Sequence, residues 1–266
     1  MFFLGYFLLS LIAAIFYHAG ANVLNDYFDY LNGADNLNQA GISPFTGGSR
    51  MIQNKIMTPG ETYILGVLFL TAGSIIGLYL AYERGVALLL IGAMGLFSGY
   101  YYTAPPVFFA GRGLGELLVG LNFGVLSVAG SYYVHAQDIS LVAVFASLPL
   151  SFLIAAILYI NEFPDYDADK AAGKNHLVVY IGMERARWGF LFIVAGAYIS
   201  IIAGIISDLL PIAALFVIPA AIFGIKAVKG LFKNYKKTTE LIPSIKATIL
   251  CHLATGLGFI VIFLLS

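Results

Sequence analysis

The chain has 266 residues, of which 60% are hydrophobic and 11% charged, and its mean hydropathy is +0.90. A soluble domain of this length has no core large enough to bury so much apolar surface, so the composition excludes a soluble protein and indicates an integral membrane protein. The formal net charge is zero and Cys251 is the one cysteine, which argues against a nucleic-acid partner and excludes an intramolecular disulfide and a cysteine-cluster metal site.

At about 20 apolar residues per crossing, the sequence predicts eight membrane-spanning helices. They cover residues 2–24, 63–81, 86–102, 114–134, 139–160, 188–206, 209–225 and 247–265. The connections at 25–62, 103–113, 161–187 and 226–246 are long and polar, and all of them fall on one side of the membrane. Thirteen of the fourteen Lys and Arg residues, all but Arg84, lie on that side, which predicts that it is cytoplasmic. We expect a single all-α domain over residues 1–266, a multi-pass bundle in the cell membrane.

An acidic phrase occurs twice in the chain, each time at the end of an apolar run. Asn25–Tyr30 reads NDYFDY and Asn161–Tyr166 reads NEFPDY. Four spans separate the two copies, so the pattern predicts two parallel four-helix repeats, about 1–134 and 139–266, around a central cavity. The alternative is a chance similarity over six residues.

The first acidic segment places carboxylates where a helix leaves the membrane. The C-terminal end of a helix carries partial negative charge, so Asp26 and Asp29 there indicate a missing cation. Asp35 lies beyond Gly33, where we expect the helix to break, and it can turn back to the same ion. A solvated acidic helix end is the simpler alternative. Arg50 follows in a flexible GGSR turn, where a topology marker is the common interpretation.

The end of the third span and the loop that follows it contribute aromatic residues and one cation. Tyr100, Tyr101 and Tyr102 end the third span, either as interface-belt aromatics or as pocket-lining residues. Tyr100 and Tyr101 are the two that we select as pocket candidates, together with Asn22 on the first span. Arg112 precedes the fourth span. Glu116 at the start of that span needs no functional explanation, because an acidic residue is favourable at a helix N-terminus.

The second acidic segment is the richer of the two. Asp165 and Asp169 have the i, i+4 spacing that puts two carboxylates side by side, and a bridging cation would relieve their repulsion. Oxygen ligands of this kind select Mg²⁺, or Mn²⁺, rather than zinc. The alternative is neutralisation by Lys170 and Lys174 without a metal. His18 and His176 have no ligand-spaced partner, and we interpret both as ordinary polar residues. The basic stretch at 226–246 is interpreted as a topology and lipid-surface determinant.

Two carboxylate clusters with nearby cations at the mouth of an apolar bundle suit a ligand with a polyanionic head and a lipid tail. A polyprenyl diphosphate has this shape, and Mg²⁺ prefers one or two carboxylates together with substrate phosphates. The metal would stabilise the leaving diphosphate, and tyrosine faces in a water-poor pocket would shield the allylic cation that remains.

These residues resemble the UbiA superfamily of intramembrane prenyltransferases. The resemblance rests on the two aspartate-rich motifs, the TGGSR segment, and YTAPP followed by GRGLGE, and it covers nearly the whole chain. It implies that the metal is held, and catalysis carried, by Asp26, Asp29, Asp165 and Asp169, supported by Asn25 and Asn161 and with Asp35 as a further ligand. By the same resemblance the diphosphate contacts are Arg50, Arg112 and Lys174. Within the superfamily, the sequence is most similar to the 1,4-dihydroxy-2-naphthoate prenyltransferases of menaquinone synthesis.

Two departures from the family pattern stand out. The commoner pattern has its third aspartate at the position of Gly33, whereas here it is Asp35. The family usually has nine spans where we count eight, and the span without a counterpart is the first.

The sequence therefore predicts an Mg²⁺-dependent enzyme that moves a polyprenyl group from its diphosphate to a lipophilic, aromatic quinone-precursor acceptor. One alternative is an archaeal-type lipid synthase of the same superfamily, which prenylates a glycerol phosphate backbone. Alternatives of other classes are a membrane transporter and a membrane-embedded binding protein without catalysis. The sequence leaves acceptor identity, prenyl chain length and oligomeric state open.

Overall fold

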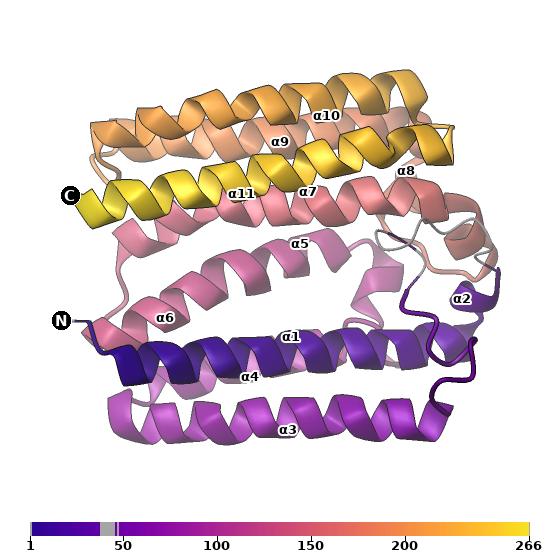
Figure 1. Cartoon of the computed structure of the whole chain (residues 1–266), viewed down its shortest axis with the longest axis horizontal. Coiled ribbons are helices and arrows are strands. Elements are labelled where there is room, and N and C mark those ends of the chain that lie inside the picture. The colour runs from indigo at the N-terminus through magenta and orange to yellow at the C-terminus, as the bar shows by residue number, and fades with distance from the viewer. Residues whose placement is uncertain (1, 38–45, 47, 266) are drawn as a thin grey trace.

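The computed structural model describes residues 2–37, 46 and 48–265, and its helices run lengthwise beside one another (Figure 1). The first half contains α1 (Leu4–Asn32), α2 (Ala34–Leu37), α3 (Pro59–Arg84), α4 (Ala87–Tyr100), the 3-10 helix η1 (Phe109–Arg112), α5 (Gly115–Gly120), the π-helix η2 (Leu121–Leu126) and α6 (Ser127–Ala136). The second half contains α7 (Leu141–Ala171), α8 (Leu177–Ile181), α9 (Met183–Ile206), the 3-10 helices η3 (Ile212–Ala220) and η4 (Thr238–Leu241), α10 (Ala221–Asn234) and α11 (Ile242–Leu265). The described residues contain no strand, so the all-α prediction is confirmed.

Seven helical stretches among the described residues are long and apolar enough to cross a membrane. The predicted third span corresponds to α4, which has 14 residues and a length of about 21 Å at 1.5 Å per residue. The chain is thus a multi-pass membrane protein, while the count of eight crossings and the division into two repeats, 1–134 and 139–266, remain predictions.

Both acidic segments are helical, which extends two of the predicted spans. Helix α1 continues to Asn32 and ends at Gly33, whose φ of 83° is in the left-handed region that glycine tolerates. This confirms the predicted break. Helix α7 continues through Pro164 to Ala171. Both motifs therefore occupy the last turns of long helices, beyond the apolar runs from which the sequence predicted the spans.

Small residues allow the helices to approach closely. In the first half, Gly66 of α3 faces Leu24 of α1, because a Cβ at Gly66 would lie 2.7 Å from the Leu24 side chain. At the junction of the halves, Gly120 and Gly124 face Ser151 of α7. The second half packs around a core of large side chains that includes Tyr159, Phe163, Phe190, Leu231 and Ile245.

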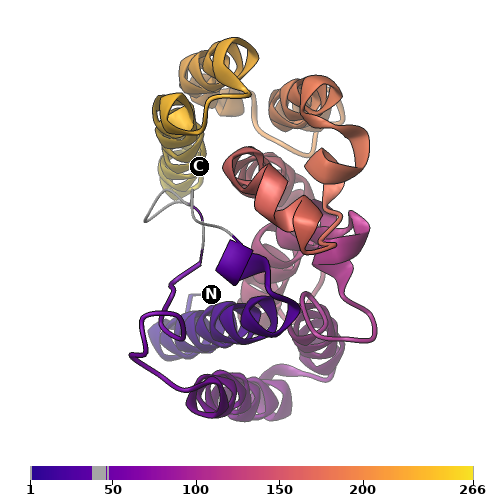
Figure 2. The same ribbon diagram turned by 90° about the vertical axis from the view of Figure 1, so that its right-hand side faces the viewer.

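The ends of α1 and α7 lie at one end of the bundle, on the right in Figure 1, and Figure 2 looks onto that end. The two chain termini lie at the opposite end. There Arg84 donates hydrogen bonds to the carbonyl oxygens of Val134 and His135, at 2.6 and 3.0 Å. A cation at the C-terminal end of a helix is favourable. The basic residue predicted on the opposite face is thus explained by capping of α6.

The close contact between η2 and α7 predicts that one added methyl group at Gly124 lowers the stability of the protein. A Cβ at Gly124 would lie 2.6 Å from the backbone Cα of Ser151, so the two helices must separate in Gly124→Ala. We expect the melting temperature of the detergent-solubilised protein to fall by several degrees. Gly92→Ala in α4 is the matched control, because a Cβ there meets no atom within 4 Å. Equal melting temperatures for the two variants would refute this packing.

Candidate functional site

Asp29 is the most heavily partnered carboxylate of the first motif. Its Oδ2 lies 2.8 Å from Nζ of Lys174 and accepts a 3.1 Å hydrogen bond from the amide of Asn25. Its Oδ1 accepts a 3.1 Å hydrogen bond from the amide of Asn32. The side chains of Asp29 and Lys174 are 8% and 16% exposed, so this ion pair is shielded from water.

The backbone at Gly48 and Ser49 lies against both Asp26 and Asp35. The Ser49 backbone N–H and hydroxyl both donate to the Asp26 carboxylate. A Cβ at Gly48 would lie 3.1 Å from Oδ1 of Asp26 and 3.2 Å from Oδ1 of Asp35, so the Gly48 backbone sits against both carboxylates. Asp35 also accepts a 3.1 Å hydrogen bond from Gln53. Asp35 thus turns back toward the first motif.

The first motif has more negative charge than its neighbours balance. Burial, followed by repulsion from Asp29 and Asp26, raises the pKa of Asp35 to about 7. A hydrogen bond from Gln53 and the charge of Lys174 only partly offset this rise. Carboxylate oxygens crowded in this way are the donor set that Mg²⁺ takes. The residues present therefore fit a divalent cation.

In the second motif, His176 lies between two carboxylates of α7. Its Nδ1 is 3.2 Å from Oε2 of Glu162 and its Nε2 is 3.2 Å from Oδ2 of Asp169. Burial alone would lower the pKa of His176, but the neighbouring carboxylates of Asp169 and Glu162 outweigh it and raise the pKa to about 9. His176 is 2% exposed. The interpretation of His176 as an ordinary polar residue was therefore wrong.

Glu116 ties the start of α5 to this cluster. Its Oε1 accepts a 3.1 Å hydrogen bond from the backbone N–H of Leu177, and Glu116 itself is 2% exposed. Glu116, Glu162 and His176 each offer an atom within 4.8 Å of the others. Sequence reasoning missed this role of Glu116, because an acidic residue at a helix start is common for local reasons. The sequence did contain one signal for this cluster. Glu162 adds a further carboxylate to the second acidic segment, and a buried carboxylate there requires a positively charged or hydrogen-bonding partner.

Lys174 joins the two motifs. Burial alone would lower its pKa, but the carboxylates of Asp29 in α1 and Asp169 in α7 outweigh burial and raise it well above the ordinary range. The sequence offered Lys174 as a neutralising partner for its own acidic segment. The structure pairs it with the first motif as well, 145 residues away along the chain.

The other predicted site residues differ in their burial and in their hydrogen-bond partners. Asn161 and Asp165 are half-buried on α7, and Oδ1 of Asn161 has no hydrogen-bond partner in the described part of the chain. Arg112 is exposed and donates a 2.9 Å hydrogen bond to the carbonyl oxygen of Pro106. Arg50 follows Ser49 directly and has a left-handed φ of 57°. Asn22 lies one helical turn before Asn25 and is hydrogen-bonded to His18 at 3.1 Å.

The three tyrosines at the end of the third predicted span lie in two different environments. Tyr100 packs edge-on against Phe28, and Tyr101 packs against Phe97. Both belong to the apolar cluster between α1, α3 and α4. Tyr102, which sequence reasoning did not select, is the one near the motifs, and the charged groups around its side chain are Glu162, Lys174, Glu116 and Asp29.

Comparison with known proteins gives three concordant results. A family model described as the UbiA prenyltransferase family matches residues 1–243. The chain is 27% identical over 242 residues to 1,4-dihydroxy-2-naphthoate octaprenyltransferase of Bacillus subtilis, covering 91% of this chain and 76% of that protein. It is 29% identical over 238 residues to 2-carboxy-1,4-naphthoquinone phytyltransferase of Synechocystis, covering 88% and 73%.

The fold has a solved counterpart. The structure of a UbiA homologue from Archaeoglobus fulgidus bound to DMAPP and Mg²⁺ superposes with a TM-score of 0.68 at 20% sequence identity, covering 98% of this chain and 88% of that one. At this identity the likeness establishes the fold, including the helical bundle architecture.

The ion pair between the motifs predicts a coupling between two substitutions. Lys174→Met leaves the Asp29 carboxylate buried without its cation, so we expect a marked loss of stability, and adding Asp29→Asn should restore part of it. The coupling free energy of the double-mutant cycle should be about 1–3 kcal/mol, measured by thermal unfolding without Mg²⁺. Additive effects of the two substitutions would mean that the pair does not join the halves.

The raised pKa of His176 predicts that the stability of the protein depends on pH. Its folded pKa of about 9 exceeds the unfolded value of about 6.5, so its contribution is complete below about pH 6.5 and is lost as the pH rises through about 9. The difference in melting temperature between wild type and His176→Gln should therefore be largest near pH 6 and vanish near pH 10, in a chelator-treated sample. A difference that does not change with pH would show that the imidazole is neutral in the folded protein.

Proposed function

The chain belongs to the UbiA prenyltransferase family, and we propose that it transfers a polyprenyl group from its diphosphate to a hydroxylated naphthoate acceptor. The observation that carries the proposal is the ion pair of Lys174 with Asp29, because Lys174 follows the second acidic segment and the pair brings both acidic motifs to one end of the bundle. The names of the relatives support the naphthoate acceptor. The DMAPP and Mg²⁺ bound to the A. fulgidus homologue support a prenyl diphosphate and Mg²⁺ as ligands here.

Each motif has a role in this reaction. We assign Mg²⁺ binding to Asp26, Asp29, Asp35, Asp165 and Asp169, with Asn25 and Asn161 orienting the carboxylates and with Mn²⁺ as a substitute ion. When bound, the metal supplies positive charge that offsets the diphosphate and the charge it gains on leaving.

We assign the direct contacts with the diphosphate to the cations that the sequence predicts there. Lys174 would donate to it in place of Asp29, and Arg50 and Arg112 are the two further cations of this assignment. Charge-assisted hydrogen bonds to a leaving oxyanion strengthen as its charge grows, so they lower the barrier to ionisation. Tyr102 lies beside these charged groups, where its ring face can stabilise the allylic cation.

Two alternatives are weaker on the residues present. A lipid synthase with a glycerol phosphate acceptor requires a second basic subsite beside the diphosphate site, and we identify none among the described residues around Asp29 and Lys174. A cation transporter usually has ionisable groups near the midplane of the membrane. Here the carboxylates of both motifs lie in the last turns of α1 and α7, at one end of the bundle.

We further propose that the motif end faces the cytoplasm, because the Lys and Arg residues gather there. Cysteine placed at the exposed Lys237 in a Cys251→Ser background should react with an impermeant maleimide only after cells are opened. Cysteine at Tyr82, 87% exposed at the opposite end, should react in intact cells. The reverse pattern would invert the topology.

The catalytic assignment predicts that both motifs are essential. In liposomes with a prenyl diphosphate, Mg²⁺ and 1,4-dihydroxy-2-naphthoate, the wild type should form prenylated product and release diphosphate. Asp29→Asn and Asp165→Asn should each reduce turnover at least 100-fold while the protein stays folded, since each removes a metal ligand. Asp138→Asn, at an exposed loop of the opposite end, is the matched control and should keep full activity.

Retained turnover in either motif variant would count against the assignment. Binding of the prenyl diphosphate by the wild type without product or diphosphate release would instead indicate a binding protein. Diphosphate release with glycerol phosphate but not naphthoate acceptors would favour the lipid synthase.

A further inference from the structure

A polar stripe runs down α1 from the first motif into the membrane-spanning part of the helix. His18, Asn22, Asn25 and Asp29 are spaced by four, three and four residues, so they share one face of the helix. Asn22 and His18 are hydrogen-bonded at 3.1 Å, as are Asn25 and Asp29. The stripe extends from His18 to Asp29, eleven rises along the helix or about 16 Å at 1.5 Å per residue.

This face is directed away from α3. The residues of α1 that face α3 are Ala13, Gly20 and Leu24, on the opposite side of the helix. His18 and Asn22 are both exposed, although they lie in a membrane-spanning helix. Polar side chains turned toward lipid would cost several kcal/mol, so those that persist in spans usually line a water-accessible or ligand-filled space. The stripe therefore lines the interior of the bundle.

The opposite wall of this space comes from η2. The ring of Phe123 stands edge-on to His18, with the ring centroids 5.0 Å apart. Its neighbour Asn122 accepts a 3.0 Å hydrogen bond from Ser98 of α4. The backbone here forms a π-helix, a distortion found frequently at functional sites. An aromatic face and hydrogen-bonding groups thus lie beside the stripe.

Beyond His18 the same face of α1 becomes apolar. Ile15 and Leu11 are exposed there, at 55% and 45%. His18 and Asn22 are therefore the hydrogen-bonding pair that lies between the charged diphosphate end and an apolar surface. An aromatic ring with hydroxyl groups requires such an intermediate environment.

We propose that the His18–Asn22 pair binds a hydroxyl group of the aromatic acceptor and holds its ring against Phe123. This proposal rests on the proposed prenyl transfer and names a positioning site for the acceptor. With Asn22 Nδ2 donating to Nε2 of His18, the pair presents the Nδ1–H of His18 as a donor and Oδ1 of Asn22 as an acceptor. A hydroxyl group can both accept from the first and donate to the second.

Steady-state kinetics of the reconstituted protein tests this site. In His18→Ala and Asn22→Leu, the KM for 1,4-dihydroxy-2-naphthoate should rise at least tenfold, while the KM for the prenyl diphosphate stays within twofold. His18→Gln, which keeps a hydrogen-bonding side chain, should recover most of the loss. His135→Gln at the opposite end of the bundle is the control and should change neither constant.

An unchanged acceptor KM would overturn the proposal. A parallel rise in both constants, or a lower melting temperature without recovery in His18→Gln, would also overturn it, because it would show a structural role. Failure of the proposed function is distinguishable, since the wild type itself would then form no prenylated naphthoate.

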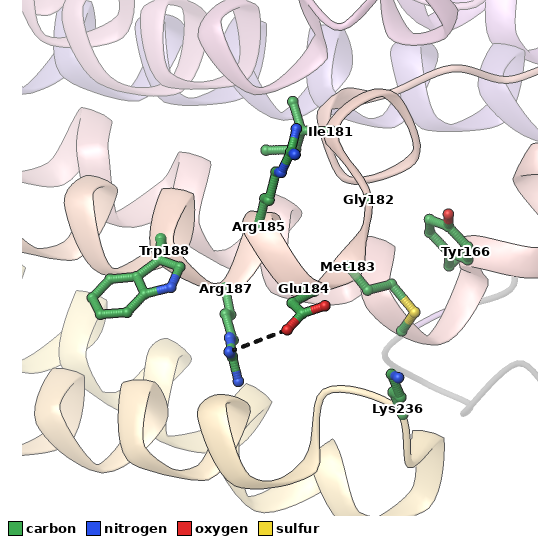
Figure 3. Close-up of a pocket in the computed structure, with 9 residues that line it drawn as sticks. All are labelled: Tyr166, Ile181, Gly182, Met183, Glu184, Arg185, Arg187, Trp188 and Lys236. Atoms are coloured by element: carbon green, nitrogen blue, oxygen red, sulfur yellow. Dashed lines mark ion pairs between the residues drawn. The ribbon is translucent and has the colours of Figure 1, made fainter.

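A second, independent observation is a basic hollow of about 660 Å³ at the start of α9 (Figure 3). Its cations are Arg185, Arg187 and Lys236, against one carboxylate, Glu184, which lies 3.8 Å from Arg187. Trp188 and Tyr166 also line it. The hollow is at the motif end of the bundle, so its occupant would sit at a membrane–water boundary.

Two aromatic rings hold Arg187 at the wall of the hollow. Its guanidinium lies 5.2 Å from the ring centre of Phe232 and 5.0 Å from that of Tyr235. Arg185 and Lys236 are exposed beside Trp188, and the one carboxylate of the hollow does not balance their charge. Exposed cations next to an interfacial tryptophan match a phosphate group attached to a lipid.

We infer that this hollow binds the phosphate of an anionic phospholipid head group. The test uses nanodiscs of phosphatidylcholine containing phosphatidylglycerol, with bound lipid counted by native mass spectrometry. Arg185→Gln with Lys236→Gln should reduce retained phosphatidylglycerol at least fivefold. Lys226→Gln with Lys246→Gln removes the same charge from exposed positions outside the hollow and should reduce it less than twofold.

Equal losses in the two double variants would overturn this inference, because the lipid would then respond to overall charge alone. Inorganic phosphate serves as the second probe. Displacement of phosphatidylglycerol by millimolar phosphate would also overturn it, by showing a site for the free anion rather than for a lipid.

Discussion

The balance of buried charge at one end of the bundle is the constraint on which the structure depends. Two long helices, α1 and α7, carry carboxylates in their last turns, where the helix dipole makes negative charge unfavourable. Lys174 offsets part of this charge by pairing with Asp29 of α1, and His176 lies between Glu162 and Asp169 of α7. Because both residues come from the short segment between α7 and α8, the charge balance also fixes how the halves meet.

The same imbalance explains why the site suits a metal–diphosphate ligand. Burial, followed by repulsion from Asp29 and Asp26, raises the pKa of Asp35 to about 7 even with Gln53 and Lys174 nearby, so a cation beside these carboxylates would be stabilising. In the proposed function a divalent ion supplies this charge, and a diphosphate then matches the ion and the surrounding cations. We propose that the prenyl chain lies along the long apolar helices beneath the site. The polar stripe on α1 provides the one surface in the described part of that helix where a hydroxylated ring would find hydrogen-bonding partners.

The helices and the carboxylates at their ends could be predicted from the sequence, because the signals for them are local. Apolar runs predicted the helical spans, Gly33 predicted the end of α1, and the repeated acidic phrase predicted carboxylates at helix ends. The roles of Lys174, His176 and Glu116 could not be predicted in this way. The partners of Lys174 and Glu116 are distant in sequence, and those of His176 lie on the preceding helix, where neither periodicity nor ligand spacing indicates which buried charges will meet. Tyr102 was missed for a related reason, since it is one of three consecutive tyrosines and only packing distinguishes it from the other two.

The most direct measurement is a structure of the protein with Mg²⁺ and a prenyl thiolodiphosphate that cannot ionise. The account predicts one diphosphate contacted from both sides, with metal ions bound to aspartates of α1 and of α7 and with Lys174 turned from Asp29 toward the phosphate. A diphosphate bound by one acidic segment alone, or bound elsewhere in the bundle, would contradict it.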